Sequence, residues 1–326
     1  MSASELSVDE ANERFEDVLQ EIESTVIGSR SFFEEVLLGF LAQGHVLMED
    51  VPGTGKTLTA QSFATAFGLS FSRIQFTPDL LPADVTGTNI YNEQEGTFDF
   101  QPGPIFSNII LADEINRAPP KTQAALLEAM GEKQVTTEGE TRELPEPFFV
   151  IATQNPVEQE GTFPLPEAQV DRFTIKTSLG YPTREGYLEL IDRRANRTEQ
   201  APSAGQVLTG TEEVLQLQAV PETVRVGDDM REYIVDIIQM TQADNRVQVG
   251  GSPRGLQRLF EAVRTRATIE GREYATPDDV KAVAGAVLAH RLVLTPEAQV
   301  NEVEKRAVVD DILEEVSVPT VEAPTQ

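Results

Sequence analysis

One short segment, 49–57, limits the possible folds of this chain more than any other. Its sequence, EDVPGTGKT, follows the apolar run 45–48 and precedes residues 56–67, which have the composition of a helix. In a strand, glycine loop and helix that follow in this order, backbone N–H groups of the loop and of the helix N-terminus point at one anion. The segment therefore predicts a site for a nucleoside triphosphate. A chance match of the short motif is the alternative, and the flanking strand and helix argue against it.

Two side chains of this loop have predicted roles. Lys56 can reach the outer phosphates, and the Thr57 hydroxyl can bind Mg²⁺. One residue departs from the common pattern, because Asp50 stands where that pattern has glycine. A carboxylate at this position would repel the phosphates, so we expect its side chain to face away from them.

The length and composition predict a soluble protein of two domains. A chain of 326 residues is long enough for two domains of the usual size, about 100 to 200 residues each. Hydrophobic residues make up 40% of the chain, and no segment approaches the roughly 18 uninterrupted apolar residues of a membrane span. The first residues are acidic and polar, without the pattern of a secretory signal. We therefore expect a cytoplasmic protein without membrane insertion.

The residue types that are rare or missing exclude several kinds of site. The chain has no cysteine, so disulfides, thiolate metal ligands and cysteine nucleophiles are impossible. His45 and His290 are its two histidines, and two histidines alone cannot form a zinc site. We expect both to be structural or surface residues.

The net charge is −28, from 54 acidic and 26 basic residues. Nothing in this balance resembles a basic nucleic-acid-binding surface, so no nucleic-acid partner is expected. Such a density of like charge destabilises a fold at low salt, whereas about 1 M salt shortens the screening length to about 3 Å. We therefore expect a halophilic host with a salt-rich cytoplasm. An ordinary acidic, highly soluble protein is the alternative.

Apolar runs alternate with helical segments in the first 182 residues. Residues 7–26 begin with Ser7 and Glu10 in capping-box spacing and place apolar residues on one helical face. Strands that alternate with helices form a parallel sheet. A hairpin is predicted near 88–101, from strand-like pieces at 88–91 and 97–101. The five predicted sheet strands are 45–48, 71–76, 109–112, 148–152 and 173–177.

After Pro182 the strand pattern ends and helix starts take over. Ser252 with Pro253, and Thr276 with Pro277, have the form of an N-cap followed by a first-turn proline. The fold class is therefore α/β: a parallel five-stranded sheet flanked by helices, with a smaller, all-helical C-terminal domain. The predicted parts are N-terminal helices (1–44), the αβ nucleotide-binding core (45–182), a helical lid (183–316) and a disordered tail (317–326).

Polar residues end two of the apolar strands. In a parallel sheet, Asp113 and Glu114 emerge at the carboxyl edge, where the phosphate loop also lies. Asp113 is placed to hold the magnesium ion, and Glu114 is placed to accept a proton from attacking water. A solvated strand end is the alternative. The next strand ends at Asn155, whose amide could orient that water or contact the γ-phosphate.

Two arginines could neutralise charge on the γ-phosphate. Arg172 directly precedes the run 173–177, and Arg254 stands at the start of a predicted lid helix. An arginine that reaches the transition state of phosphoryl transfer raises the rate by about 10³ to 10⁵. An isolated arginine more often forms a surface ion pair. The placement of Arg172 and Arg254 favours a catalytic role for both.

The motifs along the chain resemble those of MoxR-type AAA+ ATPases, a family of P-loop NTPases. The likeness extends from about Val26 to Leu294. A series of this length and order is highly specific. Its segments are VIGS, GHVLMEDVPGTGKT, RIQFTPDLLPADVTG, QPGPIF, LADEINRAPPKTQAALLEAM, ATQNP, LPEAQVDRF, SPR and VLAHR.

The resemblance implies a role for each candidate residue. Walker B would be Asp113 with Glu114, sensor 1 Asn155, the arginine finger Arg172 and sensor 2 Arg254. Thr57 and Asp113 would be the metal ligands, and the hairpin would mark the helix-2 insert clade. The Walker A loop and the first helical turn would bind nucleotide through Asp50, Val51, Pro52, Gly53, Thr54, Gly55, Lys56, Thr57 and Leu58.

The resemblance also implies ATP and Mg²⁺ as cofactors and a homo-oligomeric ring, usually hexameric. Arg172 would serve the nucleotide of the neighbouring subunit, and Arg254 would swing in from the lid of its own chain. Lid motion would then remodel client proteins, such as von Willebrand A-domain proteins, or help complexes to mature.

Two other functions are compatible with the residues. A nucleotide-dependent assembly scaffold would use ATP to hold a ring or a partner, with incidental turnover. A DNA-translocating motor is the remaining alternative, and the charge of −28 and the absence of a basic stripe argue against it.

Overall fold

One parallel sheet forms the centre of the computed structural model, which describes residues 6–137, 139–156, 161–196 and 203–319. Its five strands lie in the order β2-β5-β8-β1-β9, and every neighbouring pair is parallel. The predicted sheet is confirmed, and its strand ends lie within two residues of the predicted ones. The strands are β1 (Val46–Glu49), β2 (Phe71–Gln75), β5 (Ile109–Asp113), β8 (Phe149–Gln154) and β9 (Ile175–Thr177).

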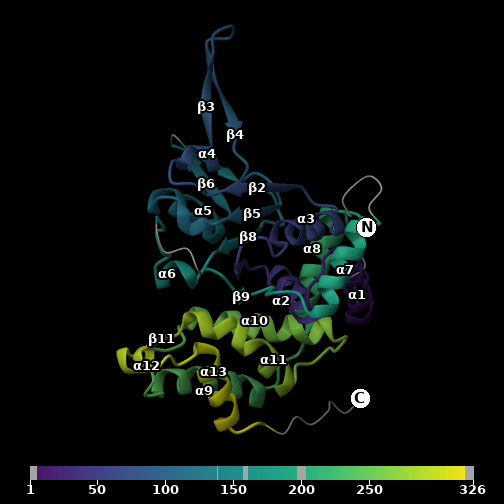
Figure 1. The fold of residues 1–326 in the computed structure, drawn as a ribbon, viewed down its shortest axis with the longest axis vertical. Helices are drawn as coiled ribbons and strands as arrows, with labels where there is room; N and C mark the ends of the chain where they lie inside the picture. The colour runs from purple at the N-terminus through teal and green to yellow at the C-terminus, as the bar shows by residue number, and fades with distance from the viewer. Residues whose placement is uncertain (1–5, 138, 157–160, 197–202, 320–326) are drawn as a thin grey trace.

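Helices cover both faces of this sheet (Figure 1), which explains why its strands are continuously apolar. Successive strand residues point to opposite faces. In β5, Ile109 and Leu111 join one core, whereas Ile110 and Ala112 join the other. The first core contains α1 (Val8–Thr25), α2 (Arg30–Leu41) and α3 (Lys56–Ala66), and the second contains α4 (Pro82–Thr86) and α5 (Pro120–Glu132).

The predicted first helix is confirmed as α1. The Ser7 hydroxyl accepts a hydrogen bond from the Glu10 N–H at 3.2 Å, and the Glu10 carboxylate accepts one from the Ser7 N–H at 2.9 Å. This capping box satisfies two N–H groups that the first turn leaves without helical partners.

The predicted hairpin is also confirmed, as β3 (Gly87–Asn92) and β4 (Thr97–Pro102), and it projects from the body of the molecule (Figure 1). Tyr91 lies opposite Phe98, with ring centroids 5.2 Å apart, and both side chains are more than half exposed. Phe100 packs against Phe106 nearer the base. The aromatic side chains of the outer part of the hairpin therefore contact each other but not the core.

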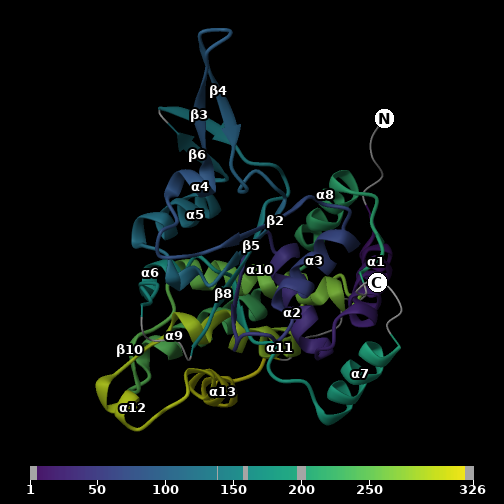
Figure 2. The ribbon, with the colours of Figure 1, turned by 45° about the horizontal axis from the view of Figure 1, so that its top comes forward.

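A second hairpin, β6 (Gln134–Thr137) with β7 (Glu140–Glu143), was not predicted from the sequence. It lies near the first hairpin (Figures 1 and 2), and the Arg142 guanidinium is 3.9 Å from the centre of the Phe100 ring. Only Val135 of these two strands is buried. The strands therefore lack the apolar alternation by which a sequence indicates a hairpin.

The C-terminal part forms the predicted helical lid. Its helix starts are capped as expected: Ser252 accepts a hydrogen bond from Gly255, and Thr276 forms a capping box with Asp279. One feature differs, because β10 (Val247–Val249) and β11 (Val293–Leu294) pair antiparallel, so the lid is not entirely helical. The lid helices are α9 (Asp228–Ala243), α10 (Pro253–Ile269), α11 (Pro277–Leu288), α12 (Pro296–Val300) and α13 (Lys305–Glu315).

Two helices stand between the sheet and the lid in the sequence, and each is tied to one of the N-terminal helices. The first, α7 (Arg184–Ala195), is tied to the end of α1 by a bond from Arg193 Nη1 to the Thr25 carbonyl at 2.7 Å. The second, α8 (Thr211–Ala219), is tied to α2 by a bond from Gln218 Nε2 to the Phe40 carbonyl at 2.8 Å. The domain boundary at residue 183 stays a prediction, and the predicted tail lies outside the described residues from 320 onward.

Both histidines are buried. Of the two expected alternatives, a structural or a surface residue, the structural one is confirmed for both. His45 accepts a hydrogen bond from the Val150 N–H, and its other ring nitrogen lies 3.1 Å from the Met130 carbonyl. Burial lowers the pKa of His45 to about 4 and that of His290 well below its usual value. Both rings are therefore kept neutral in the fold.

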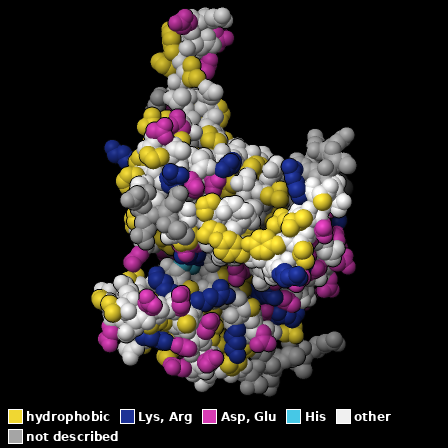
Figure 3. Space-filling model, viewed as in Figure 1, with side chains coloured by type: hydrophobic (Ala, Val, Ile, Leu, Met, Phe, Trp, Pro, Cys, Tyr) yellow, Lys and Arg dark blue, Asp and Glu magenta, His cyan; other side chains and the backbone are white. Residues whose placement is uncertain are grey.

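Acidic side chains spread over both core and lid on the face shown in Figure 3. Among the described helices, none is long and apolar enough to cross a membrane.

Candidate functional site

The glycine loop between β1 and α3 has the backbone form of a phosphate cradle. Gly53 and Gly55 have φ angles of 83° and 106°, in the left-handed region that favours glycine. A Cβ atom added at Gly53 would meet no atom within 4 Å, so the space beside the loop is open. Lys56 begins α3, and its Nζ donates to the Asp50 carbonyl at 2.8 Å. The loop thus holds its lysine next to the place where phosphates would bind.

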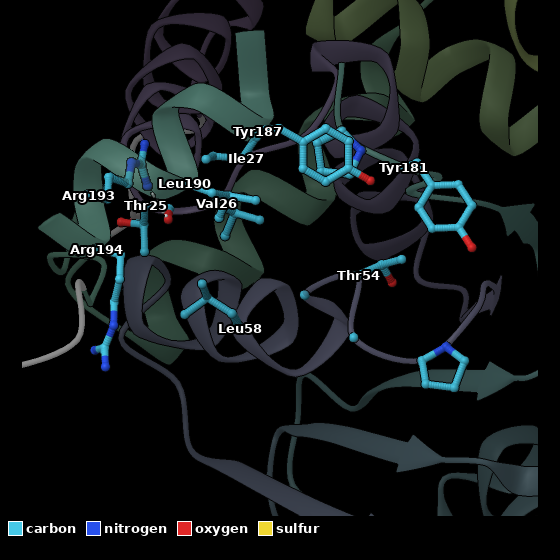
Figure 4. Close-up of a pocket in the computed structure, with 14 residues that line it drawn as sticks. Thr25, Val26, Ile27, Thr54, Leu58, Tyr181, Tyr187, Leu190, Arg193 and Arg194 are labelled. Atoms are coloured by element: carbon cyan, nitrogen blue, oxygen red, sulfur yellow. Dashed lines mark hydrogen bonds between the residues drawn. The ribbon is translucent and has the colours of Figure 1, made fainter. Parts of the chain in front are cut away.

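A pocket of about 390 Å³ borders this loop. Its walls come from the loop, from residues 25–27 and from α7 with the residues before it. Figure 4 shows the side chains of Val26, Leu58 and Leu190 gathered at one end, with Thr54 of the loop further along. A phosphate loop beside an apolar recess fits a nucleotide, whose base is apolar on its faces and whose phosphates are charged.

The sequence reasoning did not identify α7 as part of this pocket. Tyr187 and Leu190 line it from α7, and Tyr181 lines it from the preceding turn. All three belong to a segment with many exposed apolar side chains. Those exposed side chains were the available signal, because large exposed apolar groups commonly mark binding surfaces.

Asp113 lies at the carboxyl edge of the sheet, as predicted. Its side chain is largely buried. Its Oδ1 accepts a hydrogen bond from Thr153 at 2.6 Å, and its Oδ2 forms an ion pair with Arg73 Nη2 at 2.6 Å. Arg73 lies on β2, the neighbouring strand. The carboxylate therefore already binds a positive charge in the free chain.

Glu114 follows in a left-handed conformation, with φ of 56°. Its N–H donates to the Thr153 hydroxyl at 2.9 Å. Its Oε2 accepts hydrogen bonds from Gln75 at 2.8 Å and from Arg117 at 3.0 Å. Gln75 lies beside Asp113 in the register of β2 and β5. The sequence reasoning missed Arg73 and Gln75, because their position beside the acids depends on which strands are neighbours.

The residues present fit a magnesium ion. In P-loop enzymes the ion is held by one hydroxyl, one carboxylate, phosphate oxygens and water, and not by a cluster of acids. The described residues contain no group of three or more metal-ligating side chains. Thr57 lies in the first turn of α3, and Asp113 offers a largely buried carboxylate that is paired with the cation of Arg73. Thr57 and Asp113 would hold the ion.

Asn155 lies at the same edge, directly after β8. Its side chain is buried. The last residue of β8, Gln154, pairs with Glu49 of β1, the residue before the loop. The strand order therefore brings the end of β8 between the loop and the acids of β5.

Arg172 and Arg254 lie at the opposite edge of the sheet. Arg172 precedes β9, whose first residue, Ile175, pairs with Val46 at the amino end of β1. It donates to the Leu127 carbonyl of α5. Arg254, half exposed, forms an ion pair with Asp171 at 3.5 Å. Neither arginine is among the described residues that line the nucleotide pocket.

The structure thus separates the predicted site residues into two groups. The loop, Asp113, Glu114 and Asn155 share the carboxyl edge, whereas the two arginines share the amino edge. The expectation that Arg254 swings in from the lid to the nucleotide of its own chain stays a prediction, and in this structure Arg254 pairs with Asp171 instead. The reason is that the lid packs beneath the sheet and not over the loop, so the start of α10 meets Asp171 (Figure 1).

Comparisons with known proteins agree with this architecture. Residues 45–175 match the family model "ATPase family associated with various cellular activities (AAA)", and residues 239–312 match "AAA lid domain". A crystal structure of an ATPase candidate from Cytophaga hutchinsonii superposes with a TM-score of 0.88 at 39% identity, covering 95% of this chain and 96% of that one.

Two curated relatives match over nearly the whole length. The chain is 46% identical to the YeaC protein of Bacillus subtilis over 301 residues, covering 92% of this chain and 93% of that protein. It is 42% identical to the chaperone MoxR1 of Mycobacterium tuberculosis over 320 residues, covering 95% and 84% respectively. With its AAA core, its lid and these relatives, the chain belongs to the MoxR family of AAA ATPases.

Proposed function

We propose that this chain hydrolyses ATP with Mg²⁺ at the carboxyl edge of its sheet. The observation that carries the proposal is the convergence of the glycine loop, Asp113 and Glu114 at that edge, beside a pocket large enough for a nucleotide. Membership of the AAA ATPases supports it, because these proteins as a family bind and hydrolyse ATP.

The geometry supports the following roles. Lys56 binds the outer phosphates once it leaves the Asp50 carbonyl. Thr57 and Asp113 would hold the magnesium ion, which would supply positive charge beside the phosphates. Glu114 accepts the proton of the attacking water once its carboxylate is free of Gln75 and Arg117.

We further propose that the arginines act on a neighbouring subunit. Arg172 and Arg254 lie at the edge opposite their own loop, so each can reach a nucleotide only if a second copy brings its carboxyl edge there. Contact between unlike faces is heterologous and closes into a ring when the rotation allows. The family resemblance implies that such a ring is usually hexameric.

Remodelling of a client protein is the function that we propose for such a ring. Segment 178–183 leads from the carboxyl edge of the sheet to α7, which lines the pocket. The client would be a partner protein, and a von Willebrand A-domain protein fits the family resemblance. The high negative charge argues against a nucleic-acid client.

An assembly scaffold with incidental turnover remains the second candidate. One observation favours it: Arg73 and Gln75 already occupy the two acids, which would keep hydrolysis slow in the free chain.

Replacement of Glu114 by Gln tests the proposal. The variant should bind ATP as tightly as the natural chain and lose about 10² to 10⁴ of its hydrolysis rate, because only the proton acceptor is removed. Phosphate release and ATP binding are measured on the same preparation. Undiminished phosphate release would remove Glu114 from the base role, and a natural rate that responds to neither ring concentration nor partner would favour the scaffold.

A further inference from the structure

Asp50, the residue that departs from the common loop pattern, is buried and hydrogen-bonded through both carboxylate oxygens. Its Oδ1 accepts from the Ser178 hydroxyl at 2.7 Å and from the Gly180 N–H at 2.8 Å, and its Oδ2 accepts from the Leu179 N–H at 2.8 Å. Only 4% of the residue is exposed. All three donors belong to segment 178–180, which leaves β9 toward α7. The carboxylate therefore faces this segment, in agreement with the predicted orientation away from the phosphates.

The side chain and the main chain of Asp50 have separate partners. A buried carboxylate is costly unless hydrogen bonds compensate its charge, and three donors do so here. Lys56 does not take part, because its Nζ donates to the main-chain carbonyl of Asp50. The Asp50 N–H in turn donates to the Gln154 carbonyl of β8 at 3.2 Å. Removal of the carboxylate would therefore leave the contacts of the phosphate lysine in place.

Segment 178–180 packs between the loop and the turn that follows α1. Leu179 is largely buried. A Cβ atom added at Gly28 would lie 2.6 Å from one of its methyl groups, and one added at Gly55 would lie 3.8 Å from the other. The segment therefore packs against neighbours on two sides, while Asp50 binds its backbone N–H groups on the side of the loop.

The same segment carries one wall of the nucleotide pocket. The chain passes from Gly180 directly to Tyr181 and Pro182, which line the pocket, and then into α7. Tyr187 and Leu190 of α7 complete this wall (Figure 4). Only Gly186 of α7 is buried, so the helix has little core packing of its own to fix its position. Besides the bond from Arg193 to the Thr25 carbonyl, the residues that precede the helix help to set its place.

We propose that Asp50 is a positioning residue for nucleotide binding, which acts through segment 178–180 on the α7 wall that receives the nucleoside, and not through the phosphates. The inference rests on the proposed nucleotide site. It also accounts for a carboxylate in a loop that binds anions, since the three donors hold this charge apart from the loop amides.

The substitution Asp50→Gly restores the common loop pattern and removes the carboxylate. We expect the Kd for ATP to rise about tenfold or more, which is about 1.4 kcal/mol. The Kd for tripolyphosphate, which has no nucleoside, should change by less than about threefold, because the lysine and the loop amides stay in place. Both are measured by titration calorimetry on the full chain with Mg²⁺, at one KCl concentration.

The matched control is Glu49→Gln. It removes the same charge one residue earlier, where the carboxylate pairs with Lys176 at 2.7 Å, whereas the N–H groups of Leu179 and Gly180 donate to Asp50. In this variant, we expect the ratio of the Kd for ATP to the Kd for tripolyphosphate to equal that of the natural chain. An equal change of that ratio in both variants would show a general charge effect and overturn the inference.

Three other results for Asp50→Gly would also overturn it. Tighter binding of both ligands would show that the carboxylate repels phosphates. Equal weakening of both would place its effect on the loop. A lower melting temperature with an unchanged ratio would mean that the residue only supports the fold. Failure of the natural chain to bind ATP at all would instead refute the proposed function.

A second variant keeps the inference testable if Asp50→Gly does not fold. Ser178→Ala removes one of the three donors and leaves the two N–H donors. We expect the ratio of the Kd for ATP to the Kd for tripolyphosphate to rise, as in Asp50→Gly, but by only about two- to fivefold, since one hydrogen bond to a charged group is lost. An unchanged ratio in Ser178→Ala would contradict the proposal.

Discussion

The location of Arg172 at the edge opposite the glycine loop predicts how mixed assemblies behave. Two variants are used, Arg172→Ala and Glu114→Gln. If Arg172 serves a neighbour, a subunit with Arg172→Ala still has an intact loop and Glu114, and a subunit with Glu114→Gln still offers its arginine. An active interface can therefore form between two inactive subunits.

The expected magnitude follows from this geometry. Alone, each variant should lose at least about 10² to 10³ of its rate, because the base or the arginine is missing at every interface. In a random equal mixture, an interface is competent when it combines one subunit of each kind in the right order, which is about one interface in four for a heterologous ring. The mixture should therefore recover about a quarter of the natural rate.

The assay is phosphate release from an equal mixture, after subunit exchange shown by co-purification of two tags. The matched control mixes Glu114→Gln with Lys56→Ala. Both of those lesions lie at the loop edge of the same subunit, so no interface in that mixture is complete. If the Arg172→Ala mixture is no more active than this control, Arg172 does not act between subunits and the reasoning from its placement fails.

Two further predictions concern stability. The charge of −28 should make the chain more stable in about 1 to 2 M KCl than in dilute buffer, because salt screens its self-repulsion; equal urea or thermal midpoints in both buffers would refute the halophilic reading. His45 stays neutral in the fold, since burial lowers its pKa to about 4, whereas in the unfolded chain it protonates below about pH 6.5. Its contribution to stability is therefore complete above pH 6.5 and is lost as the pH falls toward 4. Between pH 7 and pH 5, the natural chain should lose about 2 kcal/mol more unfolding free energy than His45→Gln. Equal losses in urea titrations of the two proteins would contradict the neutral, buried state of this ring.

Local chemistry accounts for the parts of the fold that were predicted. The apolar runs of β5 and β8 are buried on both faces, so each has a continuous hydrophobic pattern that short-range reading detects. The capping box of Ser7 and Glu10, and the capped starts of α10 and α11, depend on residues three positions apart. The strands β6 and β7 escaped detection because their exposed, polar residues have no such pattern.

The residues of the candidate site also divide into those that the local sequence predicts and those that it does not. Lys56, Asp113 and Glu114 could be named because strand ends and a glycine loop are visible in the residues themselves. Arg73 could not, because nothing in the order of the chain places β2 beside β5. The strand order 2-5-8-1-9 is a property of the packed sheet.

The sequence alone determined that this chain has a phosphate loop, a parallel sheet with acids at its carboxyl edge, and a helical lid, because each depends on neighbours within a few residues. Tertiary structure alone decided that Asp50 holds residues some 130 positions away, and that Arg254 meets Asp171 and not its own loop. The physical reason is that both contacts depend on how separate elements pack together. Buried charge must find its partners in three dimensions, and no spacing along the chain records which partners those are.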